Sequence, residues 1–181
     1  MKFITTNIEG VVILEPRVFE DPRGFFYESY RKDVFFKNGI RDEFVQDNRS
    51  QSAKGVLRGL HYQLAPYQQA KLVGVVRGRA FDVAVDIRPG SKTFGGYVSE
   101  VLTAENRKMI YIPAGLAHGF LSLEDGTEFL YKVSKPYSPV HERGIIWNDP
   151  QISIPWPKLE VEYVISEKDK KFIQLKDVTE H

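Results

Sequence analysis

The sequence contains no cysteine among its 181 residues. Disulfides, thiolate nucleophiles and Cys-ligated zinc are therefore excluded, and the composition fits a reducing compartment. Long apolar runs are also missing, because nothing approaches the roughly 20 residues needed to span a bilayer, and we expect no membrane partner. Residues 1–16 contain only the short apolar run Val11–Leu14. We therefore expect no secretory signal and a cytoplasmic location.

An excess of one charge sign is absent as well, since 25 Lys and Arg residues are balanced by 24 Asp and Glu residues. A duplex-binding surface usually carries a basic excess, so we expect no nucleic-acid partner. A small anionic ligand needs only a few well-placed arginines, and this composition allows one. At this length we expect a single domain over residues 1–181, which would bury roughly 70 % of its unfolded surface.

Apolar and polar residues alternate with period two along most of the chain, which is typical of strands. In RAFDVAVDIR one face carries Phe81, Val83, Val85 and Ile87, and the other carries Asp82, Asp86 and Arg88. Before the C-terminal region, only residues 31–39 indicate a helix, which would end at Gly39. We predict an all-β-dominated fold, an antiparallel jelly-roll barrel or sandwich with a few short peripheral helices. Its core would span about 8–148, and the segment 149–181 would pack outside.

Two of the four histidines, His61 and His118, lie in apolar strand-like segments, whereas His141 lies in a turn-like loop and His181 is terminal. Either of the first two would, alone, be a hydrogen-bonded core histidine. However, His118 ends the Pro-x-Gly-x-x-His pattern of PAGLAHGF, which is similar to a turn of the cupin jelly rolls. His61 follows Gly55 at the spacing of the first cupin metal ligand. This pair therefore favours a cupin-type barrel with both histidines inside.

The remaining cupin metal ligands are not present. Gln63 stands where the second histidine of the cupin pattern belongs, and Lys71 stands roughly where its glutamate belongs. An ammonium group would repel a divalent cation in a low-dielectric pocket, and two ligands are too few. We therefore predict that the site holds no metal and needs no cofactor.

Lysine, histidine and tyrosine inside a barrel suit proton transfer beside a carbonyl. A desolvated Lys71 would stabilise an enolate, and such a donor typically contributes roughly 3–4 kcal/mol. A neutral imidazole of His61 is a suitable base near neutral pH. Tyr131 shares a strand face with Phe129 and Val133, and it would be either a core filler or an acid on the other side of the substrate. Base, enolate donor and acid together indicate an epimerase.

Several longer blocks carry a more specific resemblance. They occur in order from about residue 8 to about residue 170 and include DPRGFFYESY, FVQDNRSQS, GVLRGLHYQ, IPAGLAHGF, FLYKVSKPYSP and GIIWNDP. In these blocks the chain resembles the dTDP-4-dehydrorhamnose 3,5-epimerase family of cupin dTDP-sugar epimerases. The resemblance implies a cofactor-free, metal-free homodimeric isomerase. It would convert dTDP-4-dehydro-6-deoxy-D-glucose to dTDP-4-dehydro-L-rhamnose by epimerising both carbons that flank the 4-ketone.

The same resemblance implies four catalytic residues. His61 would be the base, with Asp169 behind its imidazole, Tyr131 the proton donor, and Lys71 the group facing the ketone oxygen. From the local sequence alone, Asp169 is a solvated charge in a tail. A carboxylate behind the base would fix its tautomer and stabilise the imidazolium.

Substrate contacts are also implied by the resemblance, at Arg23, Phe26, Glu28, Gln46, Asp47, Asn48, Arg58, His118, Tyr137, Glu142 and Lys168. Among them, Arg23 and Arg58 would bind the diphosphate, because forked guanidinium donors suit phosphate oxygens. Phe26 and Tyr137 would stack on the thymine. In the family the DPRGFF segment reaches the neighbouring subunit, so Arg23 and Glu28 would complete that subunit's pocket.

Three alternative functions stay open at the sequence level. One is a single-site epimerase or ketoisomerase acting on a related dTDP-4-keto sugar, and another is a non-catalytic nucleotide-sugar-binding cupin. The third is a metal-dependent cupin dioxygenase. One geometric question also stays open, since Arg58 and His61 are three residues apart and would face opposite sides of a regular strand. We expect either a bulge at Gly59 or an Arg58 side chain acting at the barrel mouth.

Overall fold

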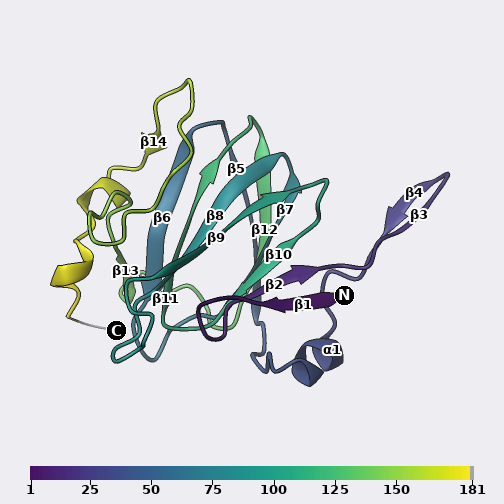
Figure 1. Cartoon of the computed structure of the whole chain (residues 1–181), viewed down its shortest axis with the longest axis horizontal. Coiled ribbons are helices and arrows are strands. Elements are labelled where there is room, and N and C mark those ends of the chain that lie inside the picture. The colour runs from purple at the N-terminus through teal and green to yellow at the C-terminus, as the bar shows by residue number, and fades with distance from the viewer. Residues whose placement is uncertain (180–181) are drawn as a thin grey trace.

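Two six-stranded sheets form the body of the molecule in the computed structural model, which describes residues 1–179 (Figure 1). His181 therefore lies outside the described residues. The first sheet has the order β1-β2-β10-β7-β12-β5. Its strands are β1 (Lys2–Thr5), β2 (Val12–Glu15), β10 (Met109–Ile112), β7 (Lys71–Arg77), β12 (Thr127–Val133) and β5 (Gln46–Ser52). All of its pairings are antiparallel.

The second sheet has the order β13-β6-β11-β8-β9, and β14 pairs with β6 in parallel. Its strands are β13 (Glu142–Gly144), β6 (Val56–Gln63), β11 (Leu116–Ser122), β8 (Arg79–Asp86), β9 (Tyr97–Thr103) and β14 (Val164–Ile165). A separate hairpin of β3 (Phe19–Asp21) and β4 (Gly24–Phe26) projects away from both sheets (Figure 1). The helical elements are α1 (Lys32–Lys37) and the 3-10 turns η1 (Asp169–Lys171) and η2 (Leu175–Asp177). The predicted all-β fold with few short helices is confirmed.

The predicted helix forms where the sequence indicated it. Phe35 is its buried anchor, and it packs with Leu14, Leu72 and Met109 on the outer face of the first sheet. The chain leaves the helix at Gly39, whose φ of +86° lies in the left-handed region that glycine adopts without steric cost. In the described part of the chain, no helix has the length and apolar character needed to cross a membrane.

The main core lies between the two sheets. Val73, Val75 and Ile110 of the first sheet meet Ala84, Leu102 and Phe120 of the second in one buried cluster. A second cluster covers the opposite face of the second sheet, where Ile152, Trp156 and Leu175 of the C-terminal segment pack. Figure 1 shows this segment, in yellow-green, running beside β6 and β13. Both faces of the second sheet are therefore buried.

Strand β8 shows the consequence of that double burial. Val83, Val85 and Ile87 do share a face, but this face packs beneath the C-terminal segment rather than inside the barrel. The other face carries Asp82, which is 0 % exposed. The apolar face is covered by the C-terminal segment, so the face with Asp82 is the one that points into the barrel. There its carboxylate can take part in a site.

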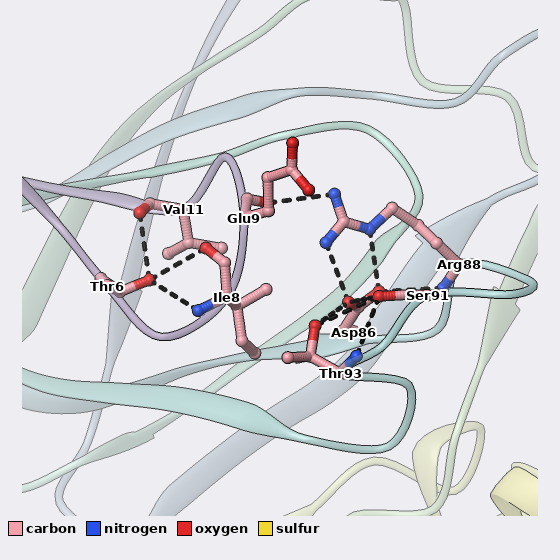
Figure 2. A network of polar contacts seen from close by, with 8 residues as sticks. All are labelled: Thr6, Ile8, Glu9, Val11, Asp86, Arg88, Ser91 and Thr93. Carbon is pink, nitrogen blue, oxygen red and sulfur yellow. Dashed lines mark hydrogen bonds and ion pairs between the residues drawn. The ribbon is translucent and has the colours of Figure 1, made fainter.

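A polar network ties the N-terminal loop to the turn after β8 (Figure 2). Asp86 is fully buried and accepts hydrogen bonds from Arg88 Nε at 2.9 Å and Nη2 at 2.8 Å, and from the hydroxyls of Ser91 and Thr93, each at 2.6 Å. Arg88 Nη1 donates to the Glu9 carbonyl at 3.0 Å. Burial alone would raise the pKa of Asp86, but these donors outweigh it and hold the pKa far below its usual range.

Replacing this carboxylate is expected to destabilise the fold by an amount that depends on pH. Asp86→Asn should lower the free energy of unfolding by about 3 kcal/mol near neutral pH, because Arg88 loses its buried partner. Since the folded-state pKa is depressed, this contribution is present above the unfolded value of about 3.9. It is lost as the pH falls toward the lowered folded value. Urea unfolding at pH 7 and pH 3 measures the difference, and an equal gap at both would contradict the assignment.

Candidate active site

A cavity of about 340 Å³ opens between the two sheets, beside a smaller one of about 160 Å³. The two share His61, Lys71 and Tyr131 among their lining residues, so we treat them as one site. His61 comes from β6 of the second sheet, whereas Lys71 and Tyr131 come from β7 and β12 of the first. The site is therefore walled by opposite sheets.

His61 and Asp169 form the best-defined polar contact of this site. His61 Nε2 lies 3.0 Å from Asp169 Oδ1, and the Gly59 amide donates to Asp169 Oδ2 at 3.1 Å. Asp169 is 3 % exposed and begins η1, where its amide donates to Ser166 Oγ at 3.0 Å. Burial raises the pKa of Asp169, but the hydrogen bonds from His61 and Gly59 hold it below its usual value. The imidazole is therefore backed by a carboxylate.

The ring of His61 is also held from the side. Phe172 meets it edge to face, with ring centroids 5.4 Å apart. Gly144 pairs with His61 across β13 and β6, and a Cβ at Gly144 would lie 2.3 Å from the Phe172 ring. Glycine at this position therefore leaves the space in which Phe172 packs against the imidazole.

A bulge in β6 explains how Arg58 and His61, three residues apart, face the same side of the strand. His61 pairs with His118 of β11 and Arg58 pairs with Phe120, so three steps on β6 correspond to two on β11. Gly59 lies in this bulge with φ of +122°, and a Cβ there would come 2.6 Å from Gly119 Cα. Arg58 and His61 consequently line the same cavity. The guanidinium of Arg58 donates to Ser52 Oγ and to the Gln51 carbonyl, each at 3.2 Å.

Lys71 lies at the start of β7 and faces two carboxylates. Burial lowers its pKa to about 8, while the charges of Asp82 and Glu142 oppose that shift. Asp82 accepts a hydrogen bond at Oδ2 from His118 Nε2 at 2.9 Å, and its Oδ1 has no hydrogen-bond partner in residues 1–179. His118 stands directly opposite His61 in the β6–β11 register. The cavity thus holds a second His–Asp pair next to the lysine.

Tyr131 lies on β12 between Asn48 of β5 and Val73 of β7. Its hydroxyl is in a largely desolvated place, and burial raises its pKa while the charge of Arg58 lowers it less. The phenol is therefore protonated at neutral pH and is available as a proton donor. Ser50 of β5, which pairs with Phe129, lines the same cavity.

A polar rim surrounds the wider end of the cavity. Tyr137 donates its hydroxyl proton to Glu142 Oε2 at 2.7 Å, and Lys168 Nζ lies 2.8 Å from Glu142 Oε1. On the facing strand, Gln46 Nε2 donates to Asn48 Oδ1 at 2.7 Å. Burial raises the pKa of Glu142, but Lys168 and Tyr137 hold it below its usual value.

Four of the residues expected to contact substrate lie away from this cavity. Asp47 points to the outer face of β5, where Lys132 Nζ lies 2.9 Å from it, because successive strand residues alternate. Arg23 and Phe26 are exposed on the β3–β4 hairpin, and the Arg23 side chain is 90 % exposed beside Asp21. Glu28 follows the hairpin and pairs with Arg31. None of these last three residues lines the cavity.

Ser50, Ser52 and Asp82 are among the lining or supporting residues that sequence reasoning missed. Ser50 and Ser52 lie on β5 on the same face as Gln46 and Asn48. The alternation of residues along this strand was the signal that could have identified them. Asp82 was placed correctly by parity, yet nothing local showed that its face is the inner one. In the described part of the chain, no three His, Asp or Glu side chains converge as a metal site requires.

Known proteins are similar to this chain over nearly its whole length. A family model described as dTDP-4-dehydrorhamnose 3,5-epimerase matches residues 5–177. A dTDP-4-dehydrorhamnose 3,5-epimerase of Shigella flexneri is 53 % identical over 177 residues, which cover 96 % of this chain and 97 % of the relative.

Solved structures are similar over nearly the whole chain. The structure of a dTDP-6-deoxy-D-glucose-3,5-epimerase from Legionella pneumophila, in complex with dTDP-4-keto-L-rhamnose, has a TM-score of 0.94 and 47 % identity, covering 98 % of this chain and 94 % of that one. A 3'-monoepimerase from Streptomyces bikiniensis, in complex with dTDP-quinovose, has a TM-score of 0.88 and 36 % identity, covering 94 % and 86 %. The predicted cupin-type epimerase fold is therefore confirmed.

Proposed function

The chain belongs to the dTDP-4-dehydrorhamnose 3,5-epimerase family, and from this premise we propose how it acts as an isomerase. Its substrate is dTDP-4-dehydro-6-deoxy-D-glucose, which it epimerises at both carbons that flank the 4-ketone, giving dTDP-4-dehydro-L-rhamnose. One observation carries the mechanism. The candidate base, His61, and the candidate acid, Tyr131, lie on opposed sheets with the cavity between them.

His61 removes the proton beside the ketone. With Nε2 directed at Asp169, Nδ1 is the basic nitrogen, and the carboxylate stabilises the imidazolium that forms. The electron pair left on carbon moves into an enolate whose oxygen faces Lys71. An ammonium in a desolvated site stabilises that charge strongly. His118, held by Asp82, adds a second polar contact on the same side.

Tyr131 returns a proton to the opposite face of the enolate, and this inverts the carbon. The burial that raises its pKa keeps the phenol protonated until that step. His61 and Tyr131 then recover their starting protonation states by exchange with solvent. The same enolate chemistry serves both carbons because each is adjacent to the one ketone.

The nucleotide is held at the polar rim. Arg58 binds the diphosphate through its forked donors, while Tyr137, Glu142 and Lys168 contact the nucleoside, with Gln46 and Asn48 on the facing strand. We also propose a homodimer in which the β3–β4 hairpin of one copy brings Arg23, Phe26 and Glu28 to the other copy's site. The projection of this hairpin from the body supports that arrangement (Figure 1).

Solvent-label incorporation tests the proposed function. Incubating the protein with the dTDP-4-keto sugar in deuterated water should place deuterium on both carbons flanking the ketone, as read by NMR. The similarity to a 3'-monoepimerase favours a second candidate, a single-site epimerase. Label on one carbon alone would select that candidate, and a folded protein that incorporates no label at either carbon would refute both.

A further inference from the structure

Gln63 is a buried amide whose hydrogen bonds join two loops at the site. It ends β6 and is 6 % exposed. Its Nε2 donates to the Tyr67 carbonyl at 2.6 Å and to the Pro136 carbonyl at 3.3 Å, and its Oε1 accepts from the Ser138 amide at 2.7 Å. All three partners are backbone groups, so the side chain acts as a clamp between residues 64–70 and residues 134–141.

The clamp brackets Tyr137. Two of its bonds fall on the residues immediately before and after this tyrosine, and the Tyr137 amide itself donates to Gln46 Oε1 at 3.2 Å. Tyr137 is 52 % exposed, so burial does little to fix its side chain. Its position therefore depends on the amide clamps at its backbone and on the bond from its hydroxyl to Glu142.

Only a neutral amide fits this position. The partners include two carbonyls, which need a donor, and one N–H, which needs an acceptor, and glutamine supplies both. Gln63 also pairs with Glu142 across β6 and β13. A carboxylate at position 63 would set a second negative charge beside Glu142 and face two carbonyl oxygens without a donor.

We propose that Gln63 is a positioning residue that sets nucleotide affinity by holding the Tyr137 loop, at the point of the strand where metal-binding cupins carry a ligand. The inference rests on the proposed function in assigning Tyr137 and Glu142 to the nucleoside. It adds that the strand has two separate tasks: His61 acts on the sugar, and Gln63, two residues on, fixes the wall that binds the nucleotide.

The test is Gln63→Met, which keeps the length of the side chain and removes all three of its hydrogen bonds. Calorimetry should show that the Kd for dTDP rises about 10-fold, or about 1.4 kcal/mol. KM for the dTDP-4-keto sugar should rise in parallel, while kcat changes less than about 3-fold, since a loss confined to binding leaves kcat intact. Hydrogen exchange of residues 134–141 should become faster. Gln63→Asn, one carbon shorter, should give a smaller effect in a protein that is less disturbed.

Gln151→Met is the matched control, because Gln151 is exposed and lines neither part of the cavity. It should leave all these values unchanged. An unaltered Kd for dTDP in a folded Gln63→Met protein would overturn the proposal, as would a fall in kcat with KM and Kd unchanged. If the wild-type protein incorporates no solvent label, the proposed epimerisation fails. The comparison of dTDP affinities still decides the role of Gln63.

Discussion

His61→Ala is expected to lower kcat by about 10²- to 10⁴-fold and to slow deuterium incorporation by a similar factor at both carbons of the dTDP-4-keto sugar. The reason is that one imidazole, held by Asp169 at 3.0 Å, is proposed to remove both protons. His61→Asn should lose as much, although it keeps a donor for the buried carboxylate. The Kd for dTDP should change little, because the nucleotide contacts lie at the rim.

The role of Asp169 is tested in the same series. Asp169→Asn removes the charge behind the imidazole and favours the wrong tautomer, so kcat should fall strongly while the fold is kept. Because the two residues act as a unit, the double variant His61→Ala with Asp169→Asn should be no worse than His61→Ala alone. Additive losses, or a wild-type rate of labelling at one carbon in His61→Ala, would contradict a shared base.

The sequence pattern was sufficient to predict the strands that carry this chemistry. Period-two alternation placed Phe129, Tyr131 and Val133 on one face, and the structure buries Phe129 and Val133 beside the cavity that Tyr131 lines. His61 and His118, expected inside a barrel, are direct cross-strand neighbours. In both cases the information is local, because alternation decides which side chains share a face.

What alternation does not decide is which face is inside. On β8 the apolar face lies beneath the C-terminal segment and the face with Asp82 lies in the barrel, because a strand covered on both sides has no solvent face to distinguish them. Similarly, the block Gln46–Asn48 was expected to contact substrate as a unit. The pleat of β5 turns Asp47 away from its neighbours.

Contacts across long sequence separations were beyond local reasoning. Asp169 reaches His61 from 108 residues away, and only the family resemblance suggested this partner. The bulge that aligns Arg58 with His61 was one of two expectations, and the register of β6 against β11 shows that it forms. Both features depend on how the tail and β11 pack against β6, which no single segment encodes.

Lys71→Met should lower kcat by about 10²- to 10³-fold, the cost of removing one preorganised donor from a developing oxyanion. It should also change the pH profile. Burial lowers the pKa of Lys71 to about 8, so the wild-type rate should fall as the pH rises through this value and the ammonium loses its proton. Tyr131 does not account for that limb, because burial raises its pKa above the usual value near 10.

Stability separates this catalytic loss from unfolding. Because the folded-state pKa of Lys71 lies below its unfolded value, the charged form is disfavoured in the fold, and the side chain destabilises the protein at neutral pH. Lys71→Met should therefore raise the Tm while it lowers kcat, since an apolar side chain of similar length suffers no such penalty. The contradicting result is a Lys71→Met variant that keeps more than a tenth of the wild-type kcat or retains the alkaline limb near pH 8. Either outcome would show that another group stabilises the enolate charge. His118, which is hydrogen-bonded to Asp82, is the structural candidate for that group.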